Sequence, residues 1–253
     1  FVEAVLKNSV AERELYSRYL DEVGFPNNSG EKVAVVDIGH NGTLQASLCK
    51  IRGLNCSHGY YFATYQKVDE VLAGVQGEHK SSGFYRDRAS SSNRDDLYIR
   101  YALMIEALFL NDKGTFLRFT KEGEKLTPNY LAGDSERRYG FNRALHSGAL
   151  DYINSLISTS KACFGKVDLE YLAVQKDVCA RYFAMLRLAA VRDARTFSSI
   201  TFENFFSGKE LRYLVPPASA LDKPGIWREG TKALAVSAKP VVVEKSKKKP
   251  SAS

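Results

Sequence analysis

Residues 32–48, which read KVAVVDIGHNGTLQASL, constrain the fold more than any other part of the chain. Four consecutive apolar residues lead directly into Asp37, and such a run is typical of a strand buried on both faces, as in a parallel sheet. A polar loop with two glycines follows. The apolar residues after the loop, Leu44, Leu48 and Ile51, recur at the spacing of an amphipathic helix. The stretch therefore predicts a strand, a tight loop and a helix of an α/β fold.

The loop is a candidate phosphate site. A glycine-rich turn from a strand into a helix points backbone N–H groups and the helix N-terminus at one place, which favours an anion. Asp37 lies at the carboxyl end of the strand, where open α/β sheets bind their ligands. The alternative is a turn that uses glycine and threonine only for its shape and for capping the helix. The candidate phosphate-binding residues are Gly39, His40, Asn41, Gly42 and Thr43.

The composition, with 44% hydrophobic and 26% charged residues in 253, is that of a globular protein. No apolar run reaches the length of a membrane span and no signal peptide is visible, so we expect a cytoplasmic protein without a transmembrane segment. The chain begins with Phe1 rather than Met, and we expect it to be a piece of a longer protein. Four widely spaced cysteines indicate reduced thiols rather than a structural metal site.

The formal net charge of +7 is concentrated near the C-terminus, because residues 239–253 hold five lysines and one glutamate. This segment contributes +4 and leaves +3 for all other residues. A solvated spacer is the simple interpretation of such a lysine run. No stripe of basic and aromatic residues accompanies it, so we expect no nucleic acid among the partners.

A strand expected at residues 58–65 follows the first helix, so that strand, helix and strand form a βαβ unit with parallel strands. Residues 2–23 predict a helix that ends at Gly24. Residues 95–110 predict a further helix, which is apolar nearly all round and therefore buried. A hairpin is expected within 111–133.

From residue 138 onward the pattern becomes helical, with expected helices over 141–160 and 169–191 and a final strand over 211–217. The residues beyond are rich in proline, glycine, alanine and lysine, which indicates disorder. The chain thus divides into three expected parts: an α/β phosphate-binding domain (1–135), a helical C-terminal subdomain (136–217) and a disordered basic linker or tail (218–253).

Two further groups of residues are candidates for the site. Residues 77–93 are polar, serine-rich and basic, which indicates either a solvated loop or a mobile flap that closes Lys80, Arg86 and Arg88 over a charged ligand. Glu106 lies in the buried helix, where a carboxylate needs a partner or a ligand. The structural alternative for Glu106 is an ion pair, for example with Arg100.

The first stretch resembles the ribose-phosphate signature of type I phosphoribosyltransferases, which is an apolar strand, two acids and a loop that ends in Gly-Thr before a helix. When the two are aligned on Gly42 and Thr43, Asp37 matches the second acid, whereas Val36 stands where the first acid belongs. The resemblance implies a Rossmann-like parallel sheet whose loop holds a ribose 5-phosphate. It also implies Mg²⁺, which acts with cationic side chains on a diphosphate.

Three motifs in order, VDIGHNGTLQASL, GYYFATY and IEALFLNDKGT, resemble the C-terminal region of large bacterial haloacid-dehalogenase-like hydrolases from surface-polysaccharide gene clusters. The resemblance covers roughly residues 12–130, and His40 stands where that family commonly has an aromatic residue. In this family a haloacid-dehalogenase-type phosphatase domain can precede a phosphoribosyltransferase-like domain. The resemblance implies transfer of a 5-phosphoribosyl group from 5-phosphoribosyl 1-diphosphate to a glycan acceptor, followed by dephosphorylation by the upstream domain.

Under this interpretation Asp37 and Glu106 are the catalytic candidates, residues 39–43 hold the 5-phosphate, and Lys80, Arg86 and Arg88 meet the diphosphate. The alternative is a non-catalytic accessory domain of a phosphatase protein of this family, which the missing first acid at position 36 favours. A nucleic-acid-binding module would rest only on the basic tail.

Overall fold

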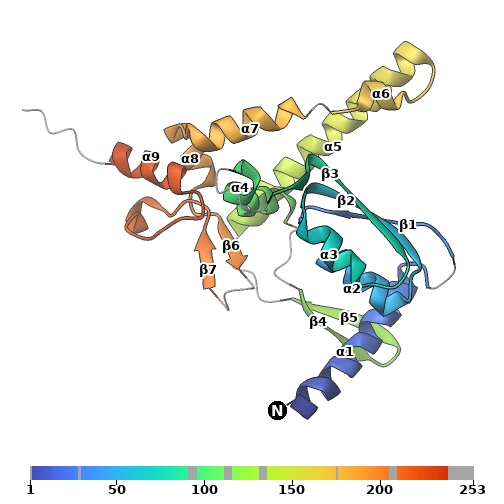
Figure 1. Ribbon diagram of the computed structural model, residues 1–253. Helices are drawn as coiled ribbons and strands as arrows, with labels where there is room; N and C mark the ends of the chain where they lie inside the picture. The colour runs from blue at the N-terminus through green and yellow to red at the C-terminus, as the bar shows by residue number, and fades with distance from the viewer. Residues whose placement is uncertain are drawn as a thin grey trace, which may run out of the picture.

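The computed structural model describes residues 2–27, 30–90, 96–110, 116–130, 136–174, 176–204 and 210–238. Side chains are described for all of these except residues 2–8, 136–138, 203–204 and 210–211. The described part is a mixed α/β structure with one parallel sheet, two antiparallel strand pairs and several helices (Figure 1).

The parallel sheet consists of β1 (Val33–Asp37), β2 (Cys56–Tyr65) and β3 (Glu78–Ala89), in that order. Two helices connect the strands, α2 (Thr43–Arg52) between β1 and β2 and α3 (Lys67–Ala73) between β2 and β3. Both strand pairs are parallel, so the βαβ unit expected from the sequence is confirmed, and a second one follows it directly.

One face of the sheet packs against α2 and α3 and forms a hydrophobic core. Val33 and Val35 of β1 contribute to this core together with Leu48 of α2 and Leu72 of α3. The alternate residues of β1 point away from it, and Val36 is 83% exposed. The expectation that this strand is buried on both faces is therefore wrong, because β1 is an edge strand with helices on one face in the described part.

The segment interpreted as a flap or loop is β3. Residues 78–89 pair in parallel with β2, and Arg88 is held by ion pairs to Asp69, at 3.1 Å, and to Asp87, at 3.0 Å. The prediction of a mobile loop is wrong for these residues, and 91–95 lie outside the described residues. The polar composition that suggested a loop suits an edge strand, which natural sheets protect with charged side chains.

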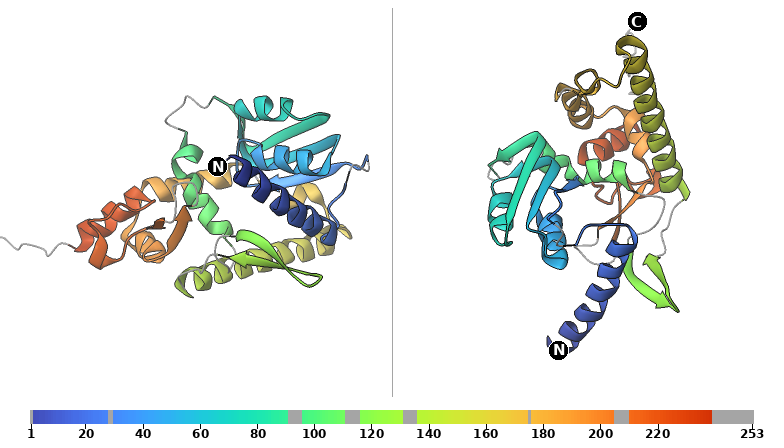
Figure 2. Two further views of the ribbon diagram at one scale, coloured as in Figure 1. Left: turned by 90° about the horizontal axis from the view of Figure 1, so that it is seen from below. Right: turned by 90° about the vertical axis from the view of Figure 1, so that its right-hand side faces the viewer.

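The helix α1 (Val2–Glu22) precedes the sheet in the chain. A hairpin of β4 (Phe116–Glu122) and β5 (Lys125–Tyr130) follows the sheet and lies beside α1 in both views of Figure 2. The hairpin is confirmed, with Gly123 at its turn in a left-handed conformation (φ 61°). Phe119 packs against Tyr19 of α1, with ring centroids 4.7 Å apart. This contact fixes the hairpin to the helix.

The second hydrophobic core is built around α4 (Leu97–Glu106), which continues as a 3₁₀ turn, η1 (Ala107–Phe109). Asp96 caps α4 by accepting a hydrogen bond from the Tyr98 N–H at 2.8 Å. The core joins the end of β2 to the C-terminal elements, whose bounds are as follows: α5 (Glu136–Phe164), α6 (Leu169–Leu172), α7 (Asp177–Arg187), α8 (Val191–Phe197), β6 (Thr201–Asn204), β7 (Glu210–Tyr213), η3 (Ala218–Ala220) and α9 (Arg228–Ala238).

The single helix expected over 169–191 is wrong, since α6, α7 and α8 divide this stretch. Ala190 is extended (ψ 149°), and this break lets α8 turn and bury Ala194 and Phe197 in the second core. Burial of two apolar side chains outweighs the helical propensity of the intervening residues.

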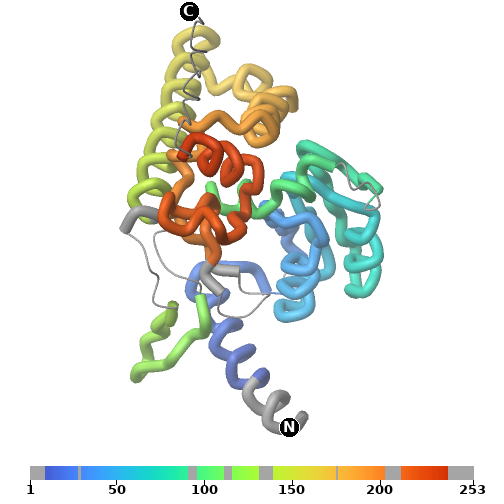
Figure 3. Tube along the Cα trace, turned by 90° about the vertical axis from the view of Figure 1, so that its left-hand side faces the viewer, coloured from blue at the N-terminus to red at the C-terminus, as the bar shows by residue number. Residues whose placement is uncertain are grey.

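The expectation of a disordered tail is also wrong for residues 218–238, which form η3 and α9. Figure 3 shows α9, in red, within the C-terminal body. Trp227 is fully buried, and its indole N–H donates to the Leu186 carbonyl oxygen at 2.7 Å. Removing a tryptophan from water stabilises a fold by roughly 5 kcal/mol, from about 200 Å² at ~25 cal/mol/Å². Residues 239–253 lie outside the described residues.

Candidate functional site

The carboxyl end of β1 carries Asp37, and the following loop folds back onto its carboxylate. The Gly39 N–H donates to Asp37 Oδ1 at 2.7 Å. A Cβ atom at position 39 would lie 3.1 Å from both carboxylate oxygens, which is tighter than ordinary contact. Glycine at this position therefore lets the backbone close over Asp37.

The loop ends at Gly42, which precedes α2 in a left-handed conformation (φ 73°). A Cβ atom there would lie 2.8 Å from Val68 Cγ2, so glycine is required both by conformation and by space. No side chain caps α2. The first N–H groups of the helix and the positive end of its dipole are therefore available to an anion.

The first turn of α2 is anchored to the sheet by Gln45, which is completely buried. Its Oε1 accepts from the Tyr61 hydroxyl at 2.8 Å, and its Nε2 donates to Ser57 Oγ at 2.7 Å and to the Lys80 carbonyl oxygen at 3.1 Å. A Cβ atom at Gly59 would lie 2.2 Å from Gln45 Oε1. Sequence reasoning missed Gln45; the available signal is an amide on the face of α2 that packs against the sheet.

His40 lies between two tyrosine rings. Its ring meets Tyr65 and Tyr98 edge to face, with centroids 5.5 and 5.6 Å apart. The Tyr98 hydroxyl donates to the Ile38 carbonyl oxygen at 2.6 Å and lies 3.4 Å from His40 Nδ1. Burial lowers the pKa of His40, and the nearby Asp37 carboxylate opposes this shift. His40 is therefore neutral at physiological pH and shapes the loop rather than attracting a phosphate by charge.

Glu106, at the end of α4, lies within electrostatic reach of Asp37. Burial raises the pKa of Glu106, and the negative charge of Asp37 raises it further. The fold thus brings together the two acids that the sequence analysis selected from distant parts of the chain. The ion pair of Arg100 joins it to Glu229 and not to Glu106. A carboxyl group with a raised pKa beside a second carboxylate is typical of sites that move protons.

The three cationic candidates do not form one group. Lys80 contributes its backbone oxygen to Gln45, and Arg88 is occupied by the ion pairs described above. Arg86 Nε lies 3.8 Å from Asp96 Oδ2, and the Arg86 charge opposes the rise in the pKa of Tyr65, whose ring meets that of His40. The structure therefore connects Arg86 to His40 through Tyr65 and gives Lys80 and Arg88 structural contacts.

The carboxylates of Asp37 and Glu106 are the available donors for a metal ion. Among the residues that the structure describes, no three His, Cys, Asp or Glu side chains gather as a metal site would need. Mg²⁺ is commonly bound by one or two carboxylates together with phosphate oxygens and water. The donor set therefore fits a Mg²⁺ ion that arrives with a phosphorylated ligand.

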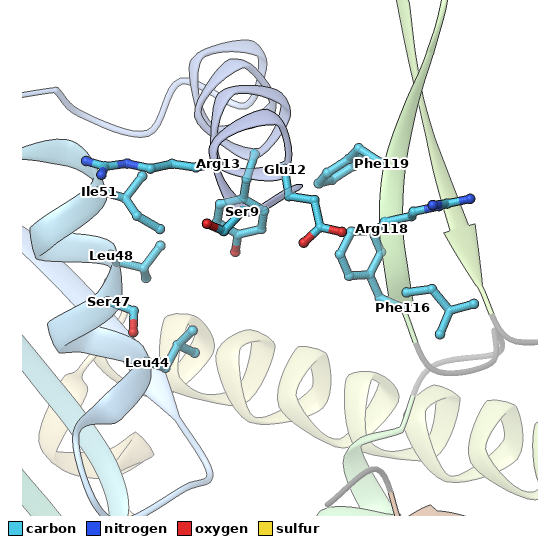
Figure 4. A pocket seen from close by; sticks show the side chains of 12 residues that line it. Ser9, Glu12, Arg13, Leu44, Ser47, Leu48, Ile51, Phe116, Arg118 and Phe119 are labelled. Carbon is cyan, nitrogen blue, oxygen red and sulfur yellow. The ribbon is translucent and has the colours of Figure 1, made fainter. Parts of the chain in front are cut away.

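A groove of about 360 Å³ runs along α2 and is enclosed by α1 and β4 (Figure 4). Leu44, the second residue of α2, lines its near end, and Figure 4 shows Leu44, Leu48 and Ile51 facing the hairpin side chains across it. Aromatic rings and charged groups form the opposite wall, namely Tyr16, Phe116, Phe119, Glu12, Arg13 and Arg118. The groove provides a binding surface next to the candidate phosphate site, and the sequence analysis did not identify it.

Comparisons with known proteins identify no relative: no family model matches the chain, and neither the curated proteins nor the solved structures give a significant match. Among the described residues, no helix combines the length and the apolar character that crossing a membrane requires. A functional assignment therefore depends on the geometry of the site and on the motifs of the sequence.

Proposed function

We propose that this protein transfers a 5-phosphoribosyl group from 5-phosphoribosyl 1-diphosphate to a hydroxyl group of a glycan, on a Rossmann-like, phosphoribosyltransferase-like sheet. The observation that supports this proposal best is the convergence of two acids beside an uncapped helix N-terminus. Asp37 and Glu106 interact electrostatically, and Asp37 also accepts the N–H of the loop that leads into α2. A phosphate group and a reacting sugar need these two elements side by side.

In the proposed complex, the 5-phosphate binds to the N–H groups of residues 39–43 and to the N-terminus of α2. This contact supplies binding energy away from the reacting carbon and fixes the ribose in place. Gly42 keeps the approach open, because any side chain there meets Val68. Gln45 holds the first turn of α2 against β2 and β3, so the phosphate site is rigid before the ligand arrives.

The reaction develops positive charge at the anomeric carbon as diphosphate leaves. In the proposed reaction Asp37 stabilises this charge, and its position at the carboxyl end of β1 beside the loop supports this role. Glu106 is the better proton acceptor near neutral pH, because its raised pKa matches the task of taking the acceptor hydroxyl proton. Mg²⁺, when bound with the donor, would neutralise the diphosphate.

The groove along α2 is the proposed position of the acceptor. Leu44, which follows the candidate phosphate residue Thr43, lines this groove. Its aromatic rings offer flat apolar faces to sugar rings, while Glu12, Arg13 and Arg118 offer partners to hydroxyl groups.

The direct assay is diphosphate release from 5-phosphoribosyl 1-diphosphate, with Mg²⁺ and oligosaccharides from bacterial surface glycans as acceptors. Acceptor-dependent release that is lost in Glu106→Gln would support the proposal. Donor binding without release for every acceptor would contradict transfer and leave the second candidate.

The second candidate is a non-catalytic accessory domain of a haloacid-dehalogenase-like phosphatase protein. The exposed face of the sheet favours it, since parallel sheets are normally covered on both faces and Val36 is 83% exposed here. Position 36 is also where the related signature has its first acid. Such a domain would bind the phosphorylated product without turning over the donor.

A further inference from the structure

A second polar pocket, of about 340 Å³, lies at the junction of α4, β7 and α9. Its volume is in the range of pockets that hold small ligands. The charged side chains that line it are mostly basic, namely Arg100, Arg212, Arg228 and Glu229. Several residues that line the pocket, among them Tyr101 and Ile226, are also part of the second hydrophobic core or pack against it. None of the lining residues belongs to the loop that follows β1.

The charges of this pocket do not balance. Arg100 forms an ion pair with Glu229. Neither Arg212 nor Arg228 has an ion pair with another side chain that the structure describes. Among the described side chains, two guanidinium groups therefore line the pocket without a carboxylate partner, and their charge matches that of a phosphate monoester dianion. Arginine is also the side chain best suited to phosphate, because its N–H groups bind two oxygens at once.

The N-terminus of α9 is part of the same pocket. The Thr231 N–H donates to the Trp227 carbonyl oxygen at 3.0 Å, so the N–H groups of residues 228–230 precede the first hydrogen bond of the helix. The Trp227 side chain cannot cap them, because an indole carries a hydrogen-bond donor and no acceptor, and that donor is bonded to the Leu186 carbonyl oxygen. Arg228 and Glu229, which line the pocket, are the first two residues of α9.

A buried hydroxyl group of the pocket lining is also unsatisfied. Tyr101 is 3% exposed, and no hydrogen bond of normal geometry involves its hydroxyl oxygen. Burial raises the pKa of Tyr101, with the nearby Glu229 carboxylate as the next cause, so the hydroxyl keeps its proton and remains a donor. This hydroxyl has no hydrogen bond of normal geometry among the described residues, although the Glu229 carboxylate lies close enough to act on its pKa, so it can donate to an acceptor atom that enters the pocket.

We propose that the pocket between α4, β7 and α9 binds a small phosphate monoester through Arg212, Arg228 and the first N–H groups of α9. This site is separate from the donor site at β1 and does not depend on the proposed transferase activity. Its ligand is recognised by the dianionic phosphate, which the arginines and the helix N-terminus bind together.

The test is a titration of the ¹⁵N-labelled protein with inorganic phosphate and, separately, with ribose 5-phosphate. The amide signals of residues 228–230 should shift with both probes, and more strongly with the ester if the pocket also holds the sugar. The double variant Arg212→Gln/Arg228→Gln should weaken binding about tenfold or more, whereas Arg192→Gln, an exposed arginine on α8, should not.

Amide signals of residues 228–230 that stay in place at millimolar phosphate in the wild-type protein would overturn the proposal without recourse to any variant. An equal loss of binding in Arg192→Gln would do the same, because it would indicate attraction by net charge alone. Blocking the β1 site with Thr43→Glu should leave the shifts of residues 228–230 unchanged. The proposals for the two sites can therefore be disproved independently of each other.

Discussion

The helices α2 and α9 both begin at a candidate phosphate site, and the charges around their N-termini are of opposite sign. At α2 the neighbouring groups are the carboxylates of Asp37 and Glu106. At α9 they are the guanidinium groups of Arg212 and Arg228. Both N-termini offer backbone N–H groups to which an anion can bind.

This difference in charge distinguishes a site that can only bind a phosphate from a site that can also catalyse a reaction. Arginines around a phosphate stabilise it without providing a proton acceptor, because they stay protonated at all relevant pH values. Carboxylates beside a phosphate weaken its binding unless a metal ion is present, yet they can stabilise positive charge and accept protons. We therefore expect the α2 site to turn over its ligand and the α9 site only to bind its ligand.

The largest effect is expected from Asp37→Asn. The amide keeps an oxygen for the Gly39 N–H, so the loop is preserved while the charge is lost. Turnover in the diphosphate-release assay should fall by about a hundredfold, and donor affinity should change only a few-fold, because the charge acts mainly in the transition state. Asp69→Asn, at an exposed acid paired with Arg88, is the matched control. Wild-type turnover in Asp37→Asn would remove Asp37 from the site.

The next effect concerns the phosphate at α2. Thr43 is exposed at the first position of the helix, so Thr43→Glu favours the helix dipole while its charge repels a phosphate. Affinity for ribose 5-phosphate should fall about tenfold or more, as measured by calorimetry. Ser47→Glu, one turn further along the same helix, adds the same charge at a greater distance and should reduce affinity much less. Equal losses in the two variants would show that the phosphate does not bind at the N-terminus.

The smallest effect is a pH-dependent change in stability at Glu106. Because its pKa is raised in the folded protein, the stability that Glu106 contributes is present below its ordinary pKa and is lost as the pH rises through the folded value. Glu106→Gln should therefore raise the free energy of unfolding at pH 7 by about 0.5–1 kcal/mol, with no gain at pH 4. Urea unfolding at both pH values measures this, and Glu14→Gln on α1 controls for the substitution itself. A gain that is equal at the two pH values would contradict a raised pKa.

The sequence predicts the region around α2 better than the rest of the chain. An apolar strand, two glycines and an amphipathic helix are local signals, and the structure has all three elements in the expected order. The sequence also indicated that Glu106 is perturbed by burial, but it did not identify Asp37 as the charged group that acts on it. Gln45 was missed because its role depends on Tyr61 and Ser57 of the neighbouring strand.

The other errors have non-local causes. The polar composition of β3 is typical of a loop, but its backbone pairs in parallel with β2. Its charged side chains are those that protect an edge strand of a sheet. The C-terminal segment has the composition of a linker, yet Trp227 and Leu234 are buried in the second core and help to order it. The pocket at α9 could not be predicted, because its arginines come from three elements that only the fold brings together.

The most direct test of the account is a titration of the wild-type protein with ribose 5-phosphate, followed by the amide signals of residues 39–44. The account predicts saturable shifts in these signals that are lost in Thr43→Glu and kept in the Arg212→Gln/Arg228→Gln variant. Signals that stay in place at millimolar ribose 5-phosphate would contradict it, because the loop would then be a turn and nothing more.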